Sequence, residues 1–272
     1  MAFAFYNAIQ LVNIPNGVLP DTIDYSYCFA NCKQIKLGNK FMLHPNIVNV
    51  QYMFLNSGLS GDLTSIIGLR LPRFTKYVNG MFAGCTKITD IPYNFLQNAN
   101  DVEDLSDLFS GCTGLKEITE NLVIPVNVKN INRMFKSCTS LKINNMQMIT
   151  YNNIISAIET FSNCTSLLAL PINFKLSTII INFSGFCFNC TSLKTIPESF
   201  WPDTYFSSTI INLTNAFNTN NGNLTAILPD NILWLDKRIT WKGNNAFYNP
   251  NCYITNKNGD ILDSKTNDWF RE

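Results

Sequence analysis

One phrase returns along the chain at an almost fixed interval, and this periodicity constrains the fold more than any other feature. Its five central copies run MFAGCTKITDIP from Met81, LFSGCTGLKEIT from Leu108, MFKSCTSLKIN from Met134, TFSNCTSLLALP from Thr160 and FCFNCTSLKTIP from Phe186. The spacings of 27, 26, 26 and 26 residues separate Cys85, Cys112, Cys138, Cys164 and Cys190. Such a repeat predicts stacked units that bury their apolar faces only against one another.

Weaker copies extend the array on both sides. They contain a phenylalanine, which we call the anchor, and some lack the cysteine: Phe29 with Cys32, Phe54 with Ser57, Phe217 and Phe247. We therefore expect about nine units of roughly 26 to 30 residues. The predicted divisions are an N-terminal cap at 1–19, the repeat region at 20–233, and a last degenerate repeat with a C-terminal cap at 234–272. In that cap, Asn258-Gly259 suits a tight hairpin turn between two short strands.

Each unit combines two apolar patterns. Apolar residues seven and four positions before the anchor predict a short helix or helical turn: Val102 and Leu105, Val128 and Ile131, Ile154 and Ala157, and Ile180 and Phe183, the last pair counted from Cys187. Apolar residues three and six positions after the cysteine, such as Leu193 and Ile196, predict a short strand. The predicted fold is an α/β leucine-rich-repeat-like right-handed solenoid, with a parallel sheet on one face and helical segments or turns on the other.

The phrase MF-x-x-CTSL-K-x-I resembles the repeat of the BspA-like leucine-rich-repeat proteins, over about residues 20 to 255. Members of that family are common on bacterial surfaces and also occur in protists and in phage of gut bacteria. The resemblance implies a solenoid used for adhesion or protein contact, and it names no partner. The chain departs from cell-surface members because it shows no evident signal peptide or anchor.

Charge and hydropathy exclude some classes of binding partner. The formal net charge is +1, from 20 basic and 19 acidic side chains, and no contiguous stretch concentrates lysine and arginine. We therefore expect no nucleic-acid partner and no membrane insertion, while the oligomeric state stays open. The N-terminus has no basic region. The lack of an evident secretory signal predicts that the chain is synthesised in the cytoplasm. From there it could be incorporated into a virion. If a leader has been removed, the cell surface is the alternative destination.

The nine cysteines have a structural and a chemical interpretation. Cys187 and Cys190 form a C-x-x-C pair, and Cys28 and Cys32 are four residues apart, so metal or redox chemistry is one alternative. The regular register favours a ladder of buried, reduced thiols instead, because free cysteine behaves as a small apolar residue. We predict no metal site and no cofactor.

No catalytic constellation stands out. His44 is the only histidine, and the chain contains neither a G-x-S-x-G sequence nor a phosphate-binding glycine pattern. The acids Asp101, Glu103, Asp104 and Asp107 are interpreted as a solvated face, with weak calcium binding or carboxylate catalysis as remote alternatives.

Function is therefore sought where the repeat is irregular. If the strand alternates, the residue before its last apolar position points outward, and this defines a candidate protein-binding face at Asp90, Glu117, Ile143, Ala169 and Thr195. Trp241 and Trp269, near the C-terminus, are added as interface anchors. The expected function is a non-enzymatic module for protein interaction or adhesion. A structural subunit of a large assembly, such as a phage virion, is the alternative.

Overall fold

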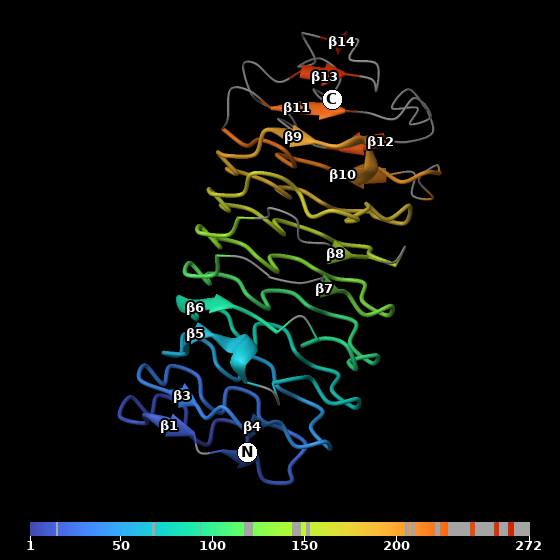
Figure 1. The fold of residues 1–272 in the computed structure, drawn as a ribbon. Coiled ribbons are helices and arrows are strands. Elements are labelled where there is room, and N and C mark those ends of the chain that lie inside the picture. The colour runs from blue at the N-terminus through green and yellow to red at the C-terminus, as the bar shows by residue number, and fades with distance from the viewer. Residues whose placement is uncertain are drawn as a thin grey trace.

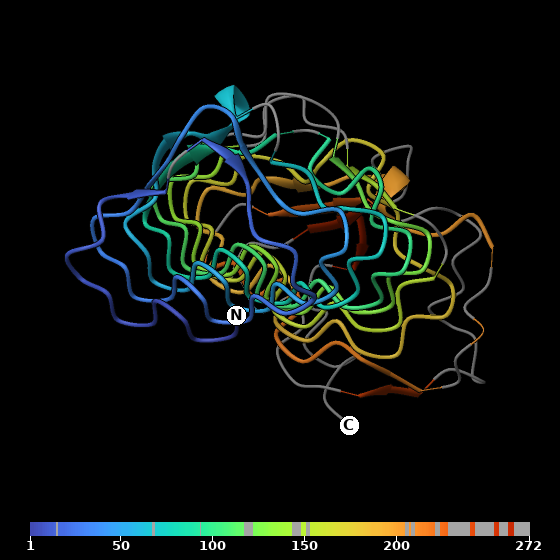
Figure 2. The ribbon, with the colours of Figure 1, turned by 90° about the horizontal axis from the view of Figure 1, so that it is seen from below.

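The repeats stack along one axis, with the N-terminus at one end and the strand β14 at the other (Figure 1). The structure is a computed structural model that describes residues 1–14, 16–66, 69–92, 94–116, 122–142, 148–150, 153–204, 207, 210–220, 224–227, 240–242, 253–255 and 261–263. We call the chain of one repeat a rung. Seen from the N-terminal end, the rungs overlap around a shared interior (Figure 2). One hydrophobic core fills it from Ile14 to Ala226.

The strands are short. They are β1 (Asn13–Ile14), β2 (Gly17–Val18), β3 (Lys36–Leu37), β4 (Phe41–Met42), β5 (Ser60–Asp62), β6 (Lys87–Asp90), β7 (Leu122–Val123), β8 (Met148–Ile149), β9 (Thr195–Ile196), β10 (Ile210–Asn212), β11 (Thr225–Ile227), β12 (Thr240–Lys242), β13 (Tyr253–Thr255) and β14 (Ile261–Asp263). Proline explains one boundary, since β9 ends directly before Pro197, which has no N–H for a ladder bond.

The strands pair in parallel between neighbouring rungs, as predicted, but among the described residues they form one four-stranded and five two-stranded sheets and not the single continuous sheet that was expected. The parallel pairs are β1 with β3, β2 with β4, β5 with β6, β7 with β8, β10 with β12, and β9 with β11 and β11 with β13. The exception is β14, which is antiparallel to β13. These are the two strands predicted on either side of Asn258-Gly259, while the turn itself lies outside the described residues.

The predicted helical segments are wrong, because the described residues contain two 3-10 helices, η1 (Leu63–Ser65) and η2 (Glu198–Phe200), and no α-helix. The segment before and after each anchor is a series of turns instead. Tyr27 and Asn31 have positive φ values of 53° and 60°, and the same two positions are left-handed in the following rungs. Two successive turns place apolar residues on one side at the same spacing as a helix does. The sequence pattern alone therefore does not distinguish a helix from a series of turns.

Hydrogen bonding explains why turns replace the helix. In the turn segment, alternate N–H groups donate to the next rung, for example Tyr27 to Gln51 O and Phe29 to Met53 O. The N–H groups between them close turns within the rung, as Cys28 does to Tyr25 O. Every backbone donor from Tyr25 to Cys32 is therefore satisfied without the i to i−4 bonds of a helix.

A polar residue begins most turn segments. Its side-chain oxygen accepts the N–H two residues later, at 2.8 to 3.0 Å, in Asp24, Asn49, Asp104, Asn130, Asn182 and Asn212. Ser156 occupies this position in one rung, and there Asn132 of the preceding rung accepts the N–H of Ile158 at 2.6 Å. The repeated asparagine therefore starts a turn that needs a side-chain acceptor.

The anchor phenylalanines form a stack through the core. Successive ring centroids are 5.4 to 5.7 Å apart, with interplanar angles of 14° or less, along Phe5, Phe29, Phe54, Phe82, Phe109, Phe135 and Phe161. The stack ends at Phe186, whose ring is turned by 82° to that of Phe161. Cys187 occupies the anchor position of that rung, as the backbone bond from its N–H to Ala216 O shows.

The repeated cysteine packs next to the stack. In six rungs its Sγ lies 2.9 to 3.2 Å from the carbonyl oxygen of the preceding anchor, and the residues are Cys32, Cys85, Cys112, Cys138, Cys164 and Cys190. The eight described cysteines are free and buried, which confirms that prediction for them, and Cys252 lies outside the described residues.

The first residues of the chain continue the same ladder. Phe5 stacks on Phe29, its N–H donates to Cys28 O, and Asn7 has the left-handed φ of 59° found at equivalent positions. Phe5 is 40% exposed, whereas the interior anchors are buried, because no rung covers its outer side. Residues 1–14 therefore form a rung with one open face.

Candidate interaction surface

On the strand side of a rung, two exposed residues lie between two buried ones. Lys194 and Thr195 are exposed between buried Leu193 and Ile196. Strict alternation would expose one residue of every two, but the buried residues are three positions apart, so two face solvent. We call this surface the strand face and define it by its exposed described residues, which are Lys36, Ser60, Gly61, Asp62, Lys87, Lys116, Lys142, Leu168, Ala169, Lys194 and Thr195.

The structure describes only part of the predicted binding face. Ala169 and Thr195 are exposed on the strand face. Glu117, Ile143 and Trp269 lie outside the described residues. Trp241 belongs to β12, of which only the backbone is described. As binding residues, all six remain predictions.

The expectation that Asp90 points to solvent is wrong. Asp90 is only 8% exposed, and its Oδ1 accepts the N–H of Ile91 at 2.7 Å. Alternation along β6, counted from buried Ile88, places Lys87 and Thr89 on the outer side and Asp90 on the inner side, and the pairing with β5 shifts register between Gly61 and Asp62. Ile88, Asp90 and Ile91 are buried together as a result.

Lysines form a row on the strand face that the sequence reasoning missed. Four of them stand four residues after a repeated cysteine, and a fifth follows Cys85 by two: Lys36, Lys116, Lys142 and Lys194, then Lys87. Lys142 N–H donates to Lys116 O at 2.7 Å, so these two lie on neighbouring rungs. The search for a contiguous basic stretch overlooked lysines such as Lys116 and Lys142, which are 26 residues apart in sequence and adjacent only across rungs.

Among the described residues, no ion pair joins a lysine of the row to an acid. Across the described ranges, every ion pair of a lysine or arginine involves a residue elsewhere, namely Lys129, Arg133, Lys136 and Lys175. On the turn side, by contrast, Arg133 holds both carboxylate oxygens of Asp107, at 2.9 and 2.7 Å. This bond raises the pKa of Arg133. These four cations are therefore paired with acids, whereas no described ion pair involves a lysine of the strand face.

The predicted solvated acidic face is confirmed in part, because Asp101 and Glu103 are exposed whereas Asp104 and Asp107 are half-buried. Glu103 pairs with Lys129 at 3.0 Å, and Asp104 accepts the N–H of Ser106 at 2.8 Å. In the described part of the chain, no three histidine, cysteine or acidic residues gather as metal ligands would.

The thiols are held in their neutral form. Burial raises the pKa of Cys28 and of Cys85 to about 11, and it raises the pKa of Cys112 and Cys138 well above the usual value. Burial also raises the pKa of Cys187 in the C-x-x-C pair. Because the thiolate is the nucleophile and the metal ligand, neutral buried thiols fit a structural ladder.

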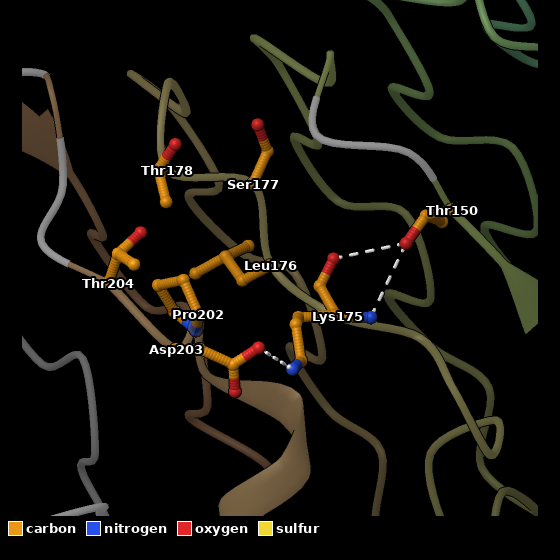
Figure 3. Close-up of a pocket in the computed structure, with 8 residues that line it drawn as sticks. All are labelled: Thr150, Lys175, Leu176, Ser177, Thr178, Pro202, Asp203 and Thr204. Atoms are coloured by element: carbon orange, nitrogen blue, oxygen red, sulfur yellow. Dashed lines mark hydrogen bonds and ion pairs between the residues drawn. The ribbon is translucent and has the colours of Figure 1, made fainter.

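A polar hollow of about 300 Å³ lies on the side of the stack where Thr150, Lys175 and Asp203 come from three successive rungs (Figure 3). Lys175 Nζ pairs with Asp203 Oδ2 at 2.6 Å, and Thr150 Oγ1 donates to Lys175 O at 3.1 Å. Because the two charges neutralise each other, the hollow does not select a charged ligand. Its volume is at the lower limit for ligand pockets.

Comparison with known proteins finds leucine-rich-repeat structures at low similarity. No protein-family model matches the chain, and no curated protein matches it. A leucine-rich repeat protein from Bacteroides ovatus is 15% identical with a TM-score of 0.43, covering 97% of this chain and 67% of that one. A leucine rich cell surface protein from Faecalibacterium prausnitzii is 14% identical with a TM-score of 0.22, covering 93% and 90%.

A third similar structure is the plant peptide hormone receptor RGFR1 in complex with RGF2, at 13% identity and a TM-score of 0.20, covering 90% of this chain and 51% of that one. At these values none of the three carries an argument about function. The repeat fold rests on the ladder bonds and the ring stack described above. None of the helices in the described ranges has the length and apolar character that a bilayer crossing requires.

Proposed function

We propose that the chain is a non-enzymatic repeat module that binds another protein across its strand face. The observation that carries the proposal is the contrast between the strand face and the rest of the rung. The anchor, cysteine and turn positions repeat because stacking requires them, whereas the strand face varies from lysine to leucine, alanine and threonine. Exposed positions that stacking does not fix are available for a partner.

The chemistry of the buried groups supports a binding role over catalysis. Cys85 and Cys138 are buried with raised pKa values, so their thiols are poor nucleophiles at neutral pH. His44 Nδ1 lies 3.2 Å from Asp21 Oδ1 at the side of the stack. The regular residues are thus accounted for by architecture, and the strand face offers an extended surface instead of a pocket.

The test uses two adjacent exposed residues. The double variant Leu168→Asp with Ala169→Glu should lower the affinity for a captured protein partner by about tenfold or more, because it places charge in the centre of the surface. Val126→Asp is the matched control, since Val126 is 45% exposed outside the strand face. Binding is measured by biolayer interferometry, and thermal unfolding verifies that both variants fold.

The opposite result would place the binding site outside the strand face. If Val126→Asp abolishes capture and the double variant binds normally, the strand face is not the working surface. Glu117, Ile143, Trp241 and Trp269 are proposed as further contacts, and the same assay applies to Ile143→Asp and Trp269→Ala.

A structural subunit of a larger assembly, such as a virion, is the second proposal. The observation that favours it is the apolar surface of the first rung, where Phe3 and Ile9 are 54% and 55% exposed. Exposed apolar patches are typical of protein contacts. Analytical ultracentrifugation of the native chain and of Phe3→Asp with Ile9→Asp tests it, and a monomer in both cases contradicts association through this rung.

A further inference from the structure

We infer that the lysine row of the strand face binds an acidic segment of a partner polypeptide. The inference rests on the proposed function, because it states the chemistry of the protein that the strand face would bind. It uses only described residues, which are Lys36, Lys87, Lys116, Lys142 and Lys194.

The first step is the distribution of charge. The whole chain has a net charge of only +1, yet its other basic groups in the described ranges include four that are paired with acids on neighbouring rungs. The five lysines of the row are exposed, no described ion pair involves them, and Asp62 is the one acid among the described residues of the strand face. The strand face is therefore a local positive surface on a nearly neutral molecule, and it attracts a complementary negative one.

The second step is spacing. Neighbouring parallel strands lie about 4.8 Å apart, and Lys116 and Lys142 are joined by a backbone bond of 2.7 Å across such an interval. Like charges at this distance repel each other, so an anion placed between them is favoured. Acidic side chains of one extended segment, lying along the stack, would contact several lysines in succession.

The third step concerns the class of the ligand, and it favours a polypeptide over a uniform polyanion. Leu168 occupies the lysine position between Lys142 and Lys194, it is 45% exposed, and Ala169 beside it is exposed as well. A chain of phosphates or sulfates would lose a contact at that rung, whereas a polypeptide places an apolar side chain there between acidic ones. Mixed apolar and charged contacts are typical of protein interfaces.

The experiment measures binding of fluorescein-labelled poly-L-glutamate by anisotropy at 50 and 300 mM salt. We expect saturable binding that weakens at the higher salt concentration, since exposed ion pairs are screened. The variant Lys116→Glu with Lys142→Glu should lower the affinity by about tenfold or more. The matched control, Lys40→Glu with Lys76→Glu, changes the net charge equally at exposed lysines outside the row and should retain binding within about twofold.

Each outcome decides the inference. It is overturned if poly-L-glutamate does not bind, or if both double variants lose affinity equally. It is also overturned if heparin or duplex DNA binds through the row and poly-L-glutamate does not, because the row would then serve another class of polymer. If Lys116→Glu with Lys142→Glu still captures the protein partner while Leu168→Asp with Ala169→Glu fails, the proposed function stands and the acidic segment is excluded.

Discussion

At the scale of single residues, the cysteine position combines a small apolar volume with a weak hydrogen-bond donor. The carbonyl oxygen of Phe109 accepts the N–H of Cys112 at 3.1 Å, and Cys138 Sγ lies 3.2 Å from the same oxygen. Ser57 occupies the same position in another rung, where its Oγ lies 3.4 Å from Cys85 Sγ. The position therefore accepts a small donor side chain in general.

Substitution of Cys138 tests the role of its donor. Cys138→Ala should lower the free energy of unfolding by about 1 to 2 kcal/mol, through a small cavity and a lost weak bond. Cys138→Ser should lose less, because the hydroxyl still donates to Phe109 O. Urea unfolding of the three proteins measures both effects. A serine variant less stable than the alanine variant would show that only the apolar character of the thiol matters.

At the scale of the element, the turn segment has a direction. After the polar residue that begins the segment, its ladder N–H groups, such as those of Phe109 and Phe135, donate toward the rung that follows in sequence. The ring of each anchor is in contact with the rings of the rungs on both sides, so an interior anchor stabilises two interfaces at once.

Removal of one ring measures that contribution. Phe135→Ala should cost about 3 to 5 kcal/mol of unfolding free energy, because the ring is fully buried between Phe109 and Phe161. Phe5→Ala is the control at the end of the stack, where the ring is 40% exposed and has one neighbour in the stack, so it should cost far less. Equal losses would contradict the stack as the source of stability. Chemical denaturation monitored by circular dichroism distinguishes the cases.

At the scale of the whole molecule, the buried thiols act together on stability. Eight free cysteines are distributed along the stack, and burial raises the pKa of Cys28 and Cys85 to about 11, above the ordinary value of 9.0. The folded state therefore holds the thiol proton more tightly than the unfolded state. This contribution is complete below about pH 9 and is lost as the pH rises toward 11.

Because the raised thiol pKa values stabilise the folded state only while the thiols are protonated, we expect the protein to unfold at alkaline pH. Two pKa units at one thiol correspond to about 2.7 kcal/mol, so the free energy of unfolding should fall steeply between pH 9 and 11, and the stack should unfold within that range. The midpoint of thermal unfolding, measured in steps of half a pH unit, checks this. Cys85→Ser, which removes one titrating thiol, should make the dependence shallower. A stability that does not change up to pH 11 would contradict buried neutral thiols.

The sequence by itself determined the repeat, its register and its core. Residues such as Phe135 and Cys138 recur at the interval of the rung, and the side chain that fills a shared interior must recur at that interval. The parallel strand pairing and the antiparallel ends at β13 and β14 followed from the same periodicity and from the turn chemistry of Asn258-Gly259.

Tertiary structure alone decided how the backbone between these residues is bonded and which charges meet. Turns replaced the predicted helix because alternate N–H groups, such as that of Phe29, find acceptors on another rung, and such bonds are absent from any local pattern. Asp90 lies on the inner side because alternation along β6 runs from buried Ile88, and the register of the two strands shifts there. The lysine row exists only after stacking, since Lys116 and Lys142 are distant in sequence and adjacent only across rungs.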